Sequence, residues 1–213
     1  MKIATTLLGP LALVAAAGHL AAQPAGAPAT PAEVAAAQSG YYVTDPAHTL
    51  VRWSVSHFGF NPYWGSFGDV EGHLHLDTQE LANSRLDVTI PIDSLAVVSE
   101  GLREHLLRPG SDGGDPDFFG PEAAPARFVS SKIRRTGPTS ALIHGELTLN
   151  GVTRPVAIAA TFTGAGANPM SKAETLGFTG RARIVRSQFG IDFAVQAVSD
   201  EVDLEISAAF ERQ

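Results

Sequence analysis

The chain has 213 residues and no cysteine, and its 15 basic and 22 acidic side chains give a formal net charge of −7. Without cysteine there are no disulfides, no thiolate metal sites and no anchor on a lipidated cysteine. The acidic balance disfavours a nucleic-acid partner. No basic amphipathic helix is apparent, so we expect no stable membrane anchor.

Residues 1–22 are expected to be a secretory signal peptide. Lys2 precedes an apolar run over residues 7–17, which is too short to span a bilayer because a span takes about 20 apolar residues. Small residues then precede Gln23, where we expect cleavage. The bacterial periplasm is the expected location, and the remaining chain is long enough to bury a core without disulfides.

Residues 23–39 are rich in alanine and proline and contain one charged side chain, Glu33. This composition predicts a flexible linker, within which residues 31–38 could form a short helix. The rest of the chain, residues 40–213, shows no second boundary and is predicted to be a single domain.

From residue 49 onward, apolar and polar residues alternate in many short segments, as in Val51, Trp53 and Val55. A period of two predicts strands with one buried face. The predicted strands are 49–58, 67–77, 85–93, 126–134, 140–150, 153–163, 174–186 and 200–211. Short turn sequences at 61–62, 136–138 and 150–151 favour antiparallel neighbours. The expected fold is all-β: a sandwich or, as eight antiparallel strands favour, a single closed eight-stranded antiparallel β-barrel, a size that can hold one small ligand.

The long connection after the third predicted strand is the exception to this pattern. Ser99 is placed to cap a short helix that ends near Leu107, and a Gly/Asp-rich loop follows. Phe118 and Phe119 come at the end of that loop. They are expected either to plug one end of the barrel or to line a ligand entrance.

No serine-nucleophile, phosphate-loop, zinc-protease or nicotinamide motif occurs. The glycines of Gly164-x-Gly166 are assigned to a loop. His73 and His75 share one face of a strand and could hold zinc, but that face also contains acidic residues, and an ordinary solvated surface explains the pattern better.

Other polar side chains could meet a ligand head group. His57 shares a face with apolar residues, where it is either a satisfied core histidine or a hydrogen-bond partner of the ligand. The same two alternatives apply to His48 and His105. Arg154 and Arg186 could meet an anionic head or pair with surface carboxylates.

Many short motifs between Tyr41 and Phe210 occur in one order that resembles the YceI-like family of secreted, lipocalin-shaped lipid-binding proteins. They are Asp45-Pro46-Ala47-His48-Thr49, Val51-x-Trp53-x-Val55-x-His57-Phe58-Gly59, Gly65-x-Phe67, Gly72, Ser94-Leu95, Arg103-Glu104-His105-Leu106, Asp117-Phe118-Phe119, Pro125-x-x-Phe128, Gly145-x-Leu147-Thr148-Leu149-x-Gly151-Val152-Thr153-Arg154-Pro155-Val156, Arg186-Ser187-x-Phe189-Gly190-Ile191 and Asp200-Glu201-Val202. The resemblance implies an extended eight-stranded barrel in the periplasm whose lumen accepts a long isoprenoid or similar amphiphile. The chain departs from the family by an insertion at residues 108–115, which affects the nearby loop rather than the barrel.

We therefore expect a non-enzymatic binding protein that holds a polyisoprenoid, an isoprenoid quinone or a similar amphiphile, for transport, storage or stress response. Besides this lipid, no cofactor or metal is expected, and a homodimer is left open. The alternatives are a metal-dependent or redox accessory protein that uses the histidines, and a ligand-free structural module. The residues expected to contact the ligand are Trp53, Val55, His57, Phe67, Leu74, Val88, Ile90, Phe118, Phe119, Phe128, Leu147, Phe178, Ile184, Phe189 and Leu204.

Overall fold

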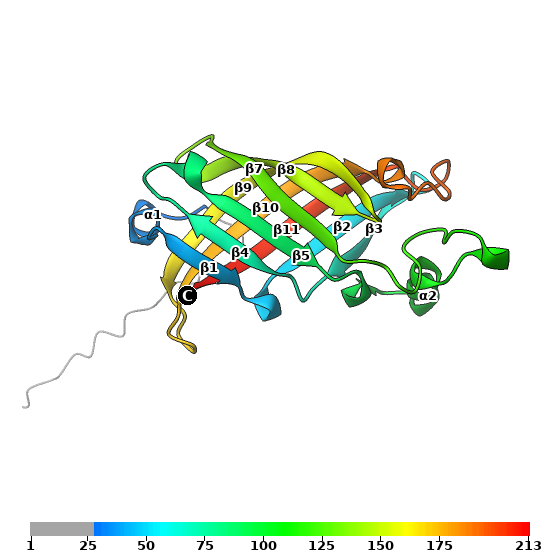
Figure 1. Ribbon diagram of the computed structural model, residues 1–213, viewed down its shortest axis with the longest axis horizontal. Helices are drawn as coiled ribbons and strands as arrows, with labels where there is room; N and C mark the ends of the chain where they lie inside the picture. The colour runs from blue at the N-terminus through cyan, green and yellow to red at the C-terminus, as the bar shows by residue number, and fades with distance from the viewer. Residues whose placement is uncertain (1–27) are drawn as a thin grey trace, which may run out of the picture.

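The computed structural model describes residues 28–213, so the expected signal peptide and the first part of the expected linker lie outside the described residues. The described chain forms a closed, elongated barrel (Figure 1). Its helices are α1 (Pro31–Ala36) and α2 (Glu100–Leu107). Its strands are β1 (Gly40–Thr44), β2 (Leu50–His57), β3 (Asn61–Phe67), β4 (Glu71–Leu76), β5 (Arg85–Ile90), β6 (Ala96–Val97), β7 (Ala126–Arg135), β8 (Ser140–Leu149), β9 (Val152–Ala167), β10 (Glu174–Val185) and β11 (Glu201–Arg212).

The eleven strand segments make eight antiparallel strands of the barrel wall, which confirms the predicted fold. β1 and β2 lie end to end along β11: β1 pairs with its last residues and β2 with residues 203–207. β3 and β4 follow β2 and β1 in the same way. β5 and β6 follow β4 and β3. The remaining strands pair in chain order from β7 to β11, and the β1–β11 pairing closes the barrel.

Two local predictions are wrong. Asn61 and Pro62 belong to β3, and the turn lies one step earlier, at residues 58–60. Proline fits there because β6 pairs only with Gly65 and Ser66, so the outer edge of β3 needs no hydrogen-bond donor at Pro62. Gly164 and Gly166 lie within β9 rather than in a loop, paired with Gly177 and Thr175 of β10.

Other local predictions are confirmed. Asn150 and Gly151 both have positive φ, 52° and 76°, as the tight hairpin between β8 and β9 requires. The Ser99 side chain accepts a hydrogen bond from the Leu102 N–H at 3.2 Å and so caps α2. Residues 31–36 form the short helix α1, whose Thr30 cap and Glu33 bond each other reciprocally.

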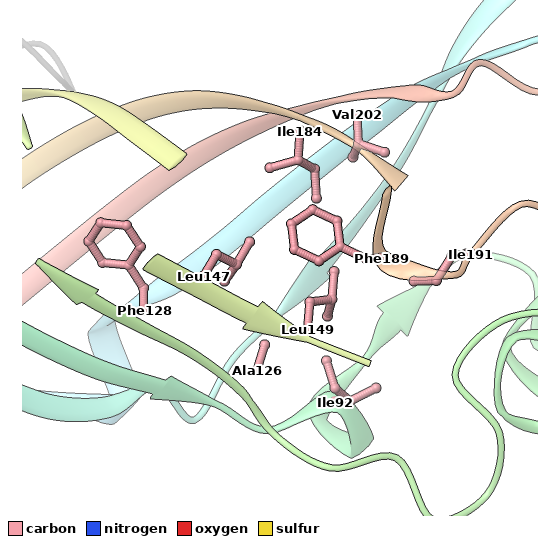
Figure 2. Close-up of a cluster of buried hydrophobic side chains, with 9 residues drawn as sticks. All are labelled: Ile92, Ala126, Phe128, Leu147, Leu149, Ile184, Phe189, Ile191 and Val202. Carbon is pink, nitrogen blue, oxygen red and sulfur yellow. The ribbon is translucent and has the colours of Figure 1, made fainter. Parts of the chain in front are cut away.

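The two ends of the barrel differ. α1 lies at one end and α2 at the other (Figure 1). At the α2 end, nine buried apolar side chains fill the interior (Figure 2). We call them the end core: Ile92, Ala126, Phe128, Leu147, Leu149, Ile184, Phe189, Ile191 and Val202. A second buried cluster, formed by Tyr42, Leu74, Leu76, Leu176 and Phe210, packs β1 and β4 together with β10 and β11.

Candidate ligand-binding cavity

A cavity of about 270 Å³ lies inside the barrel, beside the end core and reaching to the α1 end. Nearly all of its walls are apolar, and they come from every strand of the barrel wall. Cavities that hold small molecules typically measure ~300–1,000 Å³ and are lined mainly by apolar side chains, so this one lies near the lower limit. It suits an apolar ligand that is slender rather than bulky.

Side-chain size explains where the barrel is hollow. Along β10, the inward-facing residues run from Phe178 through Gly180 and Ala182 to Ile184. Gly180 and Ala182 line the cavity, together with Ala160 of β9. A barrel interior is close-packed only where its side chains have enough volume to fill it. A band of small residues on adjacent strands does not supply that volume and leaves unfilled space. Large residues on the same strand then close the α2 end.

The predicted contact residues divide into two groups. Seven of them line the cavity: Leu74, Val88, Ile90, Phe128, Leu147, Phe178 and Leu204. Seven others belong to the end core or pack against it and do not line the cavity: Trp53, Val55, Phe67, Phe118, Phe119, Ile184 and Phe189. His57 lies outside the cavity too, beside the turn at residues 58–60. We did not predict that the small residues Ala160, Gly180 and Ala182 line the cavity, although their small size and their places on adjacent predicted strands could have indicated it.

Phe118 and Phe119 lie at the closed α2 end. The Phe119 N–H donates to the Leu106 carbonyl at 3.0 Å, and its ring meets that of Phe67 edge-on at 6.0 Å between centroids. Phe118 packs edge-on against His105 and Phe193. His105 Nε2 also bonds Asp117 Oδ2 at 2.8 Å. This arrangement ties the loop after α2 to the helix and covers the end core.

The α1 end forms the mouth of the cavity, which we define by α1, residues 78–84 and residues 135–140. Val34 and Ala37 line the cavity there. The Ala29 N–H donates to the Phe162 carbonyl at 3.0 Å, so the segment lies against the barrel wall. Sequence reasoning assigned this segment no role in the site, because an Ala/Pro-rich tract has no clear apolar periodicity.

Two buried polar atoms at the α2 side have no hydrogen-bond partner among the described residues: Trp53 Nε1 and Tyr63 Oη. Their rings lie 6.5 Å apart, and the His57 ring lies 6.4 Å from that of Tyr63. A buried donor without a partner costs ~1–3 kcal/mol.

Tyr63→Phe is therefore expected to leave the free energy of unfolding unchanged or to raise it by about 1 kcal/mol, because it removes an unpaired hydroxyl and preserves the ring. Denaturant unfolding measures the effect. A loss of more than 1 kcal/mol would mean that the hydroxyl holds a bound water or ligand.

His73 and His75 lie on β4 with Leu74 between them facing the interior, and His75 packs against Tyr41 with 4.7 Å between ring centroids. Among residues 28–213, no group of three or more His, Asp or Glu side chains is placed to hold a metal ion.

Replacing both histidines by alanine is expected to change the free energy of unfolding by about 0.5 kcal/mol or less, as for most surface positions. Thermal melts with and without added zinc test this. Zinc-dependent stabilisation of the wild type that the double variant lacks would contradict it.

Arg186 holds the backbone rather than facing a ligand. It is 5% exposed, and its guanidinium donates to the carbonyls of Ser199, Ile191, Phe193 and Val198 at 2.8–3.0 Å. Burial lowers the pKa of this arginine from its usual value. An arginine side chain stays protonated in a folded protein even so.

The other side chains considered for a head group lie outside the cavity. Arg154 is exposed and donates to the Thr153 carbonyl at 3.1 Å. His48 is exposed and its Nδ1 lies 2.6 Å from Asp45 Oδ2. None of the residues weighed for a polar head group therefore lines the apolar cavity.

The fold and cavity together define a lipocalin-like barrel with an apolar lumen. Residues 42–210 match the model of the YceI-like domain, and the chain belongs to that family. A UPF0312 protein of Pseudomonas putida F1 is 32% identical over 75% of this chain and 79% of its own length. A UPF0312 protein of Vibrio vulnificus YJ016 is 34% identical over 80% of this chain and 87% of its own length.

Three solved structures share the fold. Burkholderia cenocepacia BcnA has a TM-score of 0.66 and 23% identity, covering 78% of this chain and 98% of its own. The Campylobacter jejuni YceI protein has a TM-score of 0.59 and 25% identity, covering 70% and 84%. A polyisoprenoid-binding domain from Saccharophagus degradans has a TM-score of 0.56 and 11% identity, covering 83% and 100%. Within the described part of the chain, no helix has the length and apolar character needed to cross a membrane.

Proposed function

We propose that this protein holds one long apolar molecule, such as a polyisoprenoid or an isoprenoid quinone, in the cavity of its barrel. The observation on which the proposal rests is the apolar cavity between the end core and the mouth. The solved relative named as a polyisoprenoid-binding domain supports the ligand class. The protein acts by binding, and no chemical step is required of it.

Burial of the ligand supplies the affinity. Each CH₂-sized group moved out of water contributes ~0.8 kcal/mol, so one five-carbon unit contributes roughly 3–4 kcal/mol. Burial of several such units supplies more free energy than the ~4–15 kcal/mol that association costs, and it gives micromolar or tighter binding. The flexible tail adapts to a cavity whose width is set by Gly180, Ala182 and Ala160.

Filling the cavity tests the proposal. Ala160→Leu places a larger side chain in the lumen, whereas Ala159→Leu places the same side chain on the exposed outer face of β9. We expect Ala160→Leu to abolish uptake of a long polyprenol or quinone by the delipidated protein, with circular dichroism unchanged. Ala159→Leu should bind like the wild type. Undiminished uptake by a folded Ala160→Leu variant would place the ligand elsewhere.

Solvent extraction of protein purified from its native host, followed by mass spectrometry, identifies the natural ligand. A stoichiometric lipid supports the proposal. An empty extract together with no uptake of added lipid would favour a ligand-free structural module, and protein-bound zinc or iron would favour an accessory role for the histidines.

We further propose that the protein works in the periplasm after removal of residues 1–22, on the strength of the short apolar run and the small residues before Gln23. N-terminal sequencing of protein from its host should begin near Gln23. Recovery with Met1 in place, in the cytoplasmic fraction, would contradict export.

A further inference from the structure

Arg135 is the one charged residue among those that line the cavity. It is the last residue of β7 and lies at the mouth, beside the turn that leads into β8. Along β7, Ile133 also lines the cavity, whereas the intervening Arg134 does not and is exposed on the outer face. The alternation of the strand therefore places Arg135 on the lumen side of the rim.

The Arg135 guanidinium is available to a ligand. It takes part in none of the ion pairs within residues 28–213. One of its groups, Nη1, donates to the Pro138 carbonyl at a long 3.3 Å. Since a guanidinium has five N–H donors, most of its hydrogen-bonding capacity is left for another acceptor.

Hydroxyl groups surround this position. Thr139 and Ser140 line the cavity next to Arg135. Ser140 Oγ accepts a hydrogen bond from Thr136 Oγ1 at 3.0 Å, so its own proton is free to point to a ligand. Asp77 and Glu80 lie in the neighbouring turn but do not line the cavity, and both accept backbone N–H groups of that turn.

The shape of the cavity fixes the direction of an amphiphile inside it. The α2 end is filled by the end core, where a charged group would be desolvated without a partner. A polar head must therefore remain at the mouth while the tail extends toward the end core. Among the residues that line the cavity at the mouth, the head group meets one cation, Arg135, and the hydroxyl side chains of Thr78, Ser84, Thr139 and Ser140.

We infer that the preferred ligand has an anionic head, a phosphate or a carboxylate, which Arg135 binds at the mouth with help from Thr139 and Ser140. This inference rests on the proposed function and specifies the ligand class. A guanidinium binds both kinds of head with paired N–H···O bonds. Because the mouth is open to water and salt, the contribution of Arg135 to the affinity is moderate and depends on ionic strength.

The test compares lipids that differ only in the head group: a polyprenyl phosphate against the polyprenol of equal length, and a long-chain fatty acid against the matching alcohol. Dissociation constants are measured at low and high salt for the delipidated wild type, Arg135→Gln and Arg134→Gln. Arg134→Gln is the matched control, because it removes the same charge from the outer face of the adjacent position.

We expect the wild type and Arg134→Gln to bind the anionic member of a pair about five- to tenfold more tightly at low salt, a preference that shrinks as salt is added. Arg135→Gln should bind both members alike and keep the wild-type affinity for the alcohols. A preference in either pair, or in both, supports the inference, and a preference in one pair alone identifies the head.

Equal wild-type affinities within both pairs, or a preference that survives in Arg135→Gln, would overturn the inference and leave the lipid-binding function intact. Failure of all four lipids to bind would instead overturn the proposed function. The two failures are thus distinguishable.

Discussion

Ile184→Ala and Ile206→Ala are expected to separate packing from ligand binding. Ile184 is buried in the end core and does not line the cavity, so its truncation should cost about 2–5 kcal/mol of unfolding free energy. Ile206, on the neighbouring strand β11, lines the cavity, so its truncation enlarges an existing space and should cost about 1–2 kcal/mol.

The affinity for the lipid should show the opposite pattern. Ile206→Ala removes apolar contact with a bound tail and should weaken its affinity about tenfold, whereas Ile184→Ala should leave affinity within about twofold. Denaturant unfolding and lipid titration on the same preparations measure both quantities. Equal stability losses, with lipid affinity unchanged in both variants, would mean that the interior beside Ile206 is packed by side chains.

Arg186→Met is expected to destabilise the protein by about 3–5 kcal/mol, since it leaves four backbone carbonyls of residues 191–199 without their donor. Methionine preserves most of the side-chain volume, so the loss reports the hydrogen bonds. Denaturant unfolding at neutral pH gives the value.

Arg186→Lys separates charge from geometry. Its ammonium group has three donors and cannot reach four carbonyls, so an intermediate loss is expected. If the methionine variant were as stable as the wild type, the loop at 191–199 would be held by Asp200, whose carboxylate accepts both the N–H and the hydroxyl of Ser187.

The strands and their closure were predictable because alternation is a local property of the chain. β7 to β11 were each assigned from their own residues, and the Asn150-Gly151 turn fixed one pairing. β1 and β3 were missed for local reasons too. β1 follows an Ala/Pro-rich tract, and β3 begins with Asn61-Pro62, a sequence typical of turns.

The site was predicted less completely than the fold. Large apolar residues such as Phe189 and Ile184 were expected to contact the ligand, but the structure places them in the end core. Whether an inward-facing residue meets a ligand or another side chain depends on the summed volume of residues from all strands at one level of the barrel. That sum is a property of the whole barrel and has no signature in any single strand.

The β1–β11 pairing has a consequence for how the chain folds. It joins residues 42–44 to residues 210–212, so the two ends of the domain meet at one rim, where the Gln213 N–H also donates to the Tyr41 carbonyl at 3.1 Å. Most other neighbours in the wall are closer in the chain and can pair earlier, whereas the seam that β11 forms with β1 and β2 spans almost the whole domain and is entropically costly. Until it forms, these strands expose unpaired edges that can recruit another chain. A protein truncated before residue 208 would lack the residues that pair with β1 and would leave the edge of that strand permanently unpaired, so its main hazard would be aggregation.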